Sequence, residues 1–183
     1  MEEKGEIIHS SFWSNFFNSP SKKNDLLEAL KSIPVFSEFT KKELASLAGF
    51  VHERTYLAGE YVFYQGDPGI GLYIVIEGEV IIQRNVESKL ISLATFSKND
   101  FFGELALIDG EKRSASAIAK TDLSVAVIFK PDLDEFIDTH PKKGIKILKG
   151  INHLLTMRLR KLNEDHIALH SKLLINMEKD HGT

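Results

Sequence analysis

A carboxylate and a guanidinium stand nine residues apart in a stretch that could hold a charged ligand. In residues 102–108, Gly103 is followed by Glu104 and a short apolar run that can form one helical turn. The glycine lets a ligand approach the backbone, and the N–H groups of such a turn can face an anion. Arg113 then stands among small residues, and a guanidinium suits a phosphate bidentately. These residue types predict a cradle for a phosphate and a sugar.

A structural ion pair is the alternative interpretation of this pattern. A Glu and an Arg at this separation are, taken alone, more often a surface or structural pair than a binding site. Here the glycine, the carboxylate, the apolar turn, the arginine and the small residues all fall in register, which favours ligand binding. A degenerate pocket without a ligand is a further alternative.

Residues 101–120 resemble, at nearly every position, the phosphate-binding cassette of the cyclic nucleotide-binding domains. These domains occur in the catabolite activator protein, in protein kinase A regulatory subunits and in cyclic nucleotide-gated channels. The weaker likeness runs from about Leu30 to Phe136. The resemblance implies that Glu104 takes the ribose 2′-hydroxyl and that Arg113 pairs with the cyclic phosphate. It also implies ligand contacts from the other cassette residues, namely Gly103, Leu105, Ala106, Ser114 and Ala115. Lys112 departs from the proline of many kinase-type members, which removes no ligand contact.

The resemblance also implies that a residue of the long C-terminal helix closes the pocket over the base. Aligning on the step from Arg158 to Leu159 points to Leu162 or Asn163, and the amide of Asn163 can hydrogen-bond adenine. The hydroxyl of Ser114 does not settle the base, because it occurs in adenine-binding and guanine-binding relatives. We therefore expect cAMP as the ligand, with cGMP as the second choice.

The chemistry that we expect is recognition without turnover, so the chain is not expected to be an enzyme. An enzyme that cleaves a cyclic phosphodiester usually holds metal ions through clustered His and Asp residues, and the cassette supplies none. We assign no catalytic residue, metal ligand or cofactor. DNA-binding relatives continue past this helix into a helix-turn-helix, whereas this sequence stops at Thr183. The expectation is a stand-alone sensor in signal transduction that acts through an unidentified protein partner; the chief alternative is a ligand-independent dimeric scaffold built on the same barrel.

The elements that would position the cradle are mostly short strands separated by glycine or Asn/Asp turns. Many short strands at this spacing suggest a jelly roll. Helices are expected before them, at Lys23–Ser32 and after a capping box at Thr40. The expected fold is α+β: mainly a β jelly-roll barrel with N-terminal helices and a long C-terminal helix. The strand-like segments are residues 61–64, 72–77, 80–84, 90–96, 116–119 and 124–129.

We expect three regions along the chain. Residues 1–22 form an N-terminal aromatic segment, residues 23–138 the binding domain with its leading helices, and residues 139–183 a C-terminal dimerisation helix. The aromatic side chains of the first region would form one apolar stripe on a helix. Packing of this stripe on its own domain or on a dimer mate is favoured over external docking or a membrane surface, because Lys and Arg are nearly absent beside it. The stripe consists of Phe12, Trp13, Phe16 and Phe17.

A seven-residue register from Ile145 onward predicts a parallel two-stranded coiled coil, and hence a homodimer. An amphipathic helix packed only on its own domain is the alternative, since Ile147, Ile151 and Leu154 widen the apolar stripe early. His166 is interpreted as a register-setting polar residue, with no Cys, Asp or second His at metal spacing. One seam position holds Ile145, Asn152, Leu159, His166 and Leu173, and the other holds Leu148, Leu155, Leu162, Leu169 and Asn176.

Composition excludes several other classes of protein. The 183 residues are 43% hydrophobic with a net charge of −3, which argues against a general nucleic-acid surface. No apolar run approaches the ~20 residues that span a bilayer, and no signal peptide is recognisable, so cytoplasmic residence is expected. The absence of cysteine excludes disulfides, zinc–cysteine sites and cysteine-ligated iron–sulfur clusters.

Overall fold

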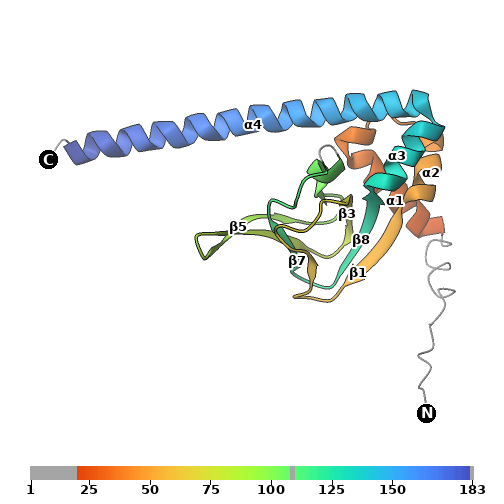
Figure 1. Ribbon diagram of the computed structural model, residues 1–183, viewed down its shortest axis with the longest axis horizontal. Coiled ribbons are helices and arrows are strands. Elements are labelled where there is room, and N and C mark those ends of the chain that lie inside the picture. The colour runs from red at the N-terminus through yellow and green to blue at the C-terminus, as the bar shows by residue number, and fades with distance from the viewer. Residues whose placement is uncertain (1–19, 108–109, 182–183) are drawn as a thin grey trace, which may run out of the picture.

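The computed structural model describes residues 20–107 and 110–181, in which helices precede and follow a set of strands (Figure 1). The leading part consists of α1 (Pro20–Ser32), the 3₁₀ turn η1 (Pro34–Phe36), α2 (Lys41–Leu47) and the 3₁₀ turn η2 (Ala48–Phe50). The strands are β1 (His52–Tyr56), β2 (Tyr61–Phe63), β3 (Gly71–Glu77), β4 (Val80–Val86), β5 (Lys89–Phe96), β6 (Phe101–Phe102), β7 (Ser116–Ala119) and β8 (Leu123–Phe129). The 3₁₀ turn η3 (Glu104–Leu107) separates β6 from β7, and α3 (Lys130–Thr139) and α4 (Pro141–His181) follow β8. The predicted aromatic stripe at Phe12–Phe17 lies outside the described residues.

Local sequence signals explain where the leading helices begin. Helix α1 starts at Pro20 rather than at the predicted Lys23, and proline is favoured at the first helical position because its missing N–H has no partner there anyway. The capping box of α2 is confirmed. The Thr40 hydroxyl accepts from the Glu43 amide, and the Glu43 carboxylate accepts from the Thr40 amide at 2.8 Å.

The strands pair into two antiparallel four-stranded sheets, in the orders β1-β8-β3-β6 and β2-β7-β4-β5. The predicted α+β jelly roll with N-terminal helices and a long C-terminal helix is confirmed. Its two sheets remain separate in the described pairings and do not close into a continuous barrel.

Two apolar clusters fill the spaces beside the first sheet. Strand β8 shows why, because successive side chains point to opposite faces and both faces are buried. Val125 and Val127 belong to the cluster between the sheets, while Ala126 and Ile128 belong to the cluster beneath the helices. Helices α1, α2 and α3 gather over the end of the fold near β1 and β8 (Figure 1). The second sheet, β2-β7-β4-β5, lies on the other side of the cluster that contains Val125 and Val127.

Helix α4 packs on the domain only through its first half. Ile147, Gly150 and Leu154 are buried, whereas the described residues from Leu155 to Lys172 are exposed. Gly150 allows the closest approach, because a Cβ there would collide with the backbone of Val35 in η1. The second half of α4 extends beyond the sheets (Figure 1). Among the described residues, no helix is both long and apolar enough to cross a membrane.

Candidate functional site

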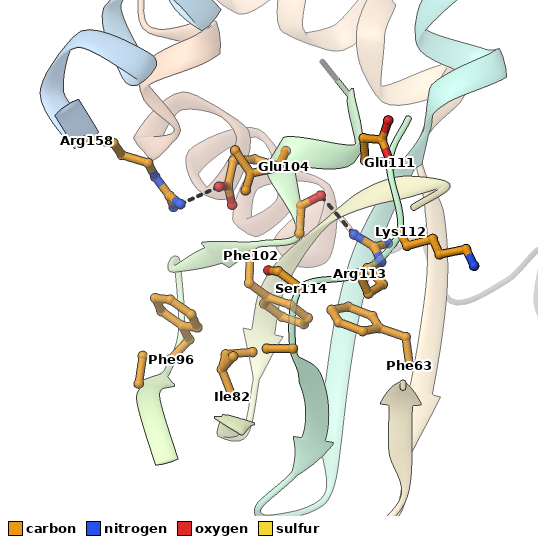
Figure 2. Close-up of a pocket in the computed structure, with 14 residues that line it drawn as sticks. Phe63, Ile82, Phe96, Phe102, Glu104, Glu111, Lys112, Arg113, Ser114 and Arg158 are labelled. Atoms are coloured by element: carbon orange, nitrogen blue, oxygen red, sulfur yellow. Dashed lines mark hydrogen bonds and ion pairs between the residues drawn. The ribbon is translucent and has the colours of Figure 1, made fainter. Parts of the chain in front are cut away.

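A cavity of about 380 Å³ opens between η3, the loop before β7 and the strands of the second sheet. Its volume lies within the ~300–1,000 Å³ typical of small-molecule sites. Figure 2 shows a polar end, where Glu104 and Arg113 lie, and an apolar wall that includes Phe63, Ile82 and Phe96. The two chemically distinct halves suit a ligand with a charged group at one end and a flat apolar body at the other.

Arg113 is buried, with 7% of its surface exposed, and no carboxylate pairs with it in the described residues. Its Nη1 donates to the Gly103 carbonyl at 3.0 Å and its Nη2 donates to the Gly71 carbonyl at 2.9 Å. The guanidinium carbon also lies 4.1 Å from the centre of the Phe63 ring, a cation–π contact. Burial lowers the pKa of Arg113 from its usual value, yet arginine stays protonated in proteins. The site therefore contains a fixed, buried positive charge.

One donor of this guanidinium has no hydrogen-bond partner among the described residues, namely the buried Nε–H of Arg113. Buried donors without a partner are rare and costly, and in a native protein each calls for an explanation such as an absent ligand. Backbone hydrogen bonds hold the loop that carries this side chain: the Arg113 amide donates to the Asp67 carbonyl, and the Gly66 amide donates to the Arg113 carbonyl. The fold thus holds the Arg113 backbone in place and leaves one donor of its side chain unpaired.

Position 103 requires glycine for two reasons, the backbone conformation and the space that Arg113 occupies. Its φ of +74° lies in the left-handed region, which side chains with a Cβ rarely adopt. A Cβ there would also lie 2.6 Å from Nη1 of Arg113. Sequence alone predicted this glycine for the approach of a ligand, and the structure adds that it makes room for Arg113.

Glu104 begins the turn η3 and is 4% exposed. Its carboxylate forms an ion pair with Nη1 of Arg158, a residue of α4 whose side chain is 45% exposed (Figure 2). Arg158 therefore links the pocket to the C-terminal helix. Sequence reasoning missed this link, although a signal was present: Arg158 continues the helical spacing of the buried Ile147 and Leu154.

The structure brings most of the predicted site residues together. Asn163 is exposed on α4 and is not among the described lining residues, so its contact with a base stays a prediction. The backbone of Ala106 lies in η3, and its side chain is outside the described ones. The predicted residues that line the cavity are Gly103, Glu104, Leu105, Arg113, Ser114 and Ala115, and the apolar wall was not predicted.

Comparisons with known proteins identify the family of this fold. The family model described as the cyclic nucleotide-binding domain matches residues 53–140. That part of the chain belongs to the cyclic nucleotide-binding domain family. Among solved structures, a cyclic nucleotide-binding domain from Methylobacillus flagellatus superposes with a TM-score of 0.68 at 27% identity, covering 77% of this chain and 80% of that one.

Two curated relatives are regulators. The regulatory subunit of cAMP-dependent protein kinase from Hypocrea atroviridis is 33% identical over 101 residues, which are 55% of this chain and 21% of that protein. The cyclic AMP receptor protein of Thermus thermophilus is 31% identical over 132 residues, which are 72% of this chain and 59% of that protein. The similarity thus spans less than two thirds of the length of either relative.

Proposed function

We propose that this chain is a regulatory sensor that binds cAMP, or with lower preference cGMP, and acts through a protein partner. The observation that carries the proposal is the unpartnered Nε–H of the buried Arg113, in the same cavity as the buried Glu104. A cyclic phosphodiester has one negative charge, and beside it a ribose hydroxyl that can donate a hydrogen bond. The cavity offers a buried cation, Arg113, and a buried acceptor, Glu104, for these two groups.

The proposed pose follows from the chemistry of the two ends. The phosphate would accept from Arg113 and from the amide of Ala115, with the hydroxyl of Ser114 beside them. The ribose 2′-hydroxyl would donate to the Glu104 carboxylate, and the base would lie toward the apolar wall. For Asn163 to reach the base, α4 would have to move toward the cavity when the ligand binds.

The ion pair between Glu104 and Arg158 supports α4 as the element that transmits binding. A ligand hydroxyl that donates to Glu104 changes what this carboxylate offers to Arg158, so the ligand has different affinities for different positions of α4. We propose that α4 also mediates homodimerisation, because its predicted seam is exposed: Leu162 is 64% exposed and Leu169 is 59% exposed.

Calorimetry with cAMP and cGMP tests the proposal directly. We expect Arg113→Ala to abolish measurable binding, because leaving a buried phosphate unpaired costs roughly 2–5 kcal/mol. Arg113→Lys keeps the charge without the planar fork and should bind more weakly than wild type. Arg84→Ala is the matched control, because Arg84 is an exposed arginine of strand β4 outside the lining residues.

The result that would overturn the proposal is unchanged affinity in both Arg113 variants. Arg113 contributes two hydrogen bonds to the fold, so thermal unfolding of each variant must accompany the titrations. If Arg113→Ala does not fold, Arg113→Lys decides the outcome.

A ligand-independent dimeric scaffold is the second candidate function, and the exposed seam of α4 favours it, since this feature exists independently of the pocket. The same titrations separate the two candidates. A protein that dimerises but produces no heat with either nucleotide is a scaffold.

A further inference from the structure

Two histidines of α4 form an exposed pair one helical turn apart. His166 and His170 stand at positions i and i+4, which places their side chains on one face of the helix. Their ring centres are 6.4 Å apart. This is the histidine spacing of helical zinc motifs. The sequence-based interpretation that His166 has no second histidine at metal spacing is therefore wrong, since His170 is at that spacing.

Little would hinder this pair from closing on a metal ion. With Zn–N bonds of about 2.0–2.1 Å and a tetrahedral angle, the two ring centres would be about 5 Å apart. Both residues are exposed, and no hydrogen bond to the other described side chains fixes either ring. A small side-chain rotation therefore brings the rings from the observed separation to that of a chelate.

One copy of the helix supplies only two of the ligands. In the described residues no group of three or more His, Asp or Glu could hold a metal. The predicted heptad register would bring a third ligand from a second copy. His166 lies at seam position a, His170 at position e, and Asp165 at position g of the preceding heptad. In a parallel two-stranded coil, position g of one helix faces position e of the other helix in the next heptad.

We propose that the dimer holds two zinc-type divalent ions, each bound by His166 and His170 of one copy and by Asp165 of the other copy. Two imidazoles and one carboxylate are three ligands that zinc accepts, with the fourth position left for water. Asp165 now pairs with Lys161 at 2.9 Å, but both side chains are exposed, so this pair is worth little and can be given up. The proposal rests on the homodimer of the proposed function.

Titration of the full chain with zinc alone, without nucleotide, tests the site. We expect one zinc per chain by calorimetry. His166→Ala, His170→Ala and Asp165→Asn should each weaken binding by at least about tenfold, since the loss of outer-sphere partners alone costs about 10–100-fold. His153→Ala and Glu164→Gln are the matched controls, because both residues are exposed on the same helix outside the proposed site.

The role of the second copy has its own readout. Zinc should shift sedimentation equilibrium toward the dimer, and a monomeric variant, Leu162→Lys with Leu169→Lys, should bind zinc at least about tenfold more weakly because it lacks the third ligand. Zinc affinity that is indifferent to the histidine variants overturns the site. Affinity that is indifferent to monomerisation or to Asp165→Asn, or a wild type that stays monomeric with zinc, overturns the intersubunit arrangement. Nucleotide binding is measured separately without metal and is tested by the Arg113 variants, so its outcome is independent of the zinc result.

Discussion

Arg113 and Glu104 lie in one cavity, yet they are held there by different parts of the molecule. Arg113 is oriented by two carbonyls, that of Gly103 in the cassette and that of Gly71 in strand β3 of the sheet. Glu104 is paired with Arg158, which belongs to the C-terminal helix. The phosphate end of the pocket is therefore fixed by the domain, whereas the acceptor end depends on the position of α4.

Replacing Glu104 by glutamine separates a ribose contact from a structural role. We expect Glu104→Gln to weaken cAMP binding by about tenfold, because a hydrogen bond to a charged acceptor is stronger than one to a neutral amide. Binding of 2′-deoxy-cAMP, which lacks the hydroxyl, should be weak and nearly equal in wild type and variant. Calorimetry with both ligands measures this, with Glu135→Gln on the exposed face of α3 as control.

Equal losses for the two ligands would mean that Glu104 acts through Arg158 and the fold and not through the ribose. In that case the polar end of the cavity would need another partner for the sugar.

At the scale of elements, α4 has two adjacent faces. One face carries Ile147 and Leu154 against the domain and reaches Arg158 at the pocket. The other carries the predicted seam, in which Leu155, Leu159 and Leu162 are exposed. Large apolar side chains in a row on an exposed helix are typical of an interface with another helix.

Replacing two leucines of the seam by lysine should dissociate the homodimer. In Leu162→Lys with Leu169→Lys, each lysine would face its own copy across the dimer axis, and like charges there are unfavourable. We expect monomers by light scattering at concentrations where wild type is dimeric. The matched control is Glu164→Lys with Ser171→Lys, which adds two lysines at the same separation on the opposite, exposed face. A dimer that persists in the seam variant would exclude α4 as its interface.

The sequence predicted those elements whose cause is local. The capping box of α2 is complete within four residues, and the cassette brings Glu104 and Arg113 together through one short loop. Arg158 was missed because its contact with Glu104 joins residues 54 positions apart, and only the packing of α4 determines which helix face meets the pocket. Asn163 was chosen by aligning the helix alone, without that packing.

The histidine pair shows a second kind of omission. A heptad description places His166 in the seam and considers its contacts with other seam residues only. His170 lies outside the seam, so the contact between the two rings is visible only when the helix is considered as a surface with neighbours at four residues. The strand pattern predicted a jelly-roll barrel, but it could not predict which strands pair, and hence whether the two sheets join, because this depends on long-range register.

At the scale of the whole molecule, one ion pair joins the leading helices to the C-terminal helix. Lys146 of α4 donates to both oxygens of the Glu43 carboxylate, at 2.8 and 2.9 Å. This bond, with those from Thr40, lowers the pKa of Glu43 from 4.5 to about 2. The same carboxylate thus caps α2 and anchors α4.

Acid should weaken this connection in a defined pH window. Because the pKa of Glu43 is lower in the folded than in the unfolded protein, its stabilisation is fully present above about pH 4.5 and is lost as the pH falls toward about 2. We expect Glu43→Gln to be less stable than wild type at neutral pH, with a difference that shrinks across this window. Thermal unfolding between pH 7 and pH 2.5 measures it.

Glu28→Gln is the control, because Glu28 is an exposed carboxylate of α1. A stability difference between wild type and Glu43→Gln that stays constant down to the lowest pH would show that the carboxylate charge is not what joins the two helices.

The close approach at Gly150 turns α4 into a lever. The helix is pinned where Gly150 meets Val35, and it continues as one uninterrupted element to His181. At 1.5 Å per residue, Arg158 lies about 12 Å from this pivot and His170 about 30 Å from it. A tilt that moves Arg158 by about 1 Å at the pocket therefore displaces the helix near His170 by about 2.5 Å. A small displacement at the binding site therefore grows along the helix, and it is largest in the part of α4 where a second copy would bind.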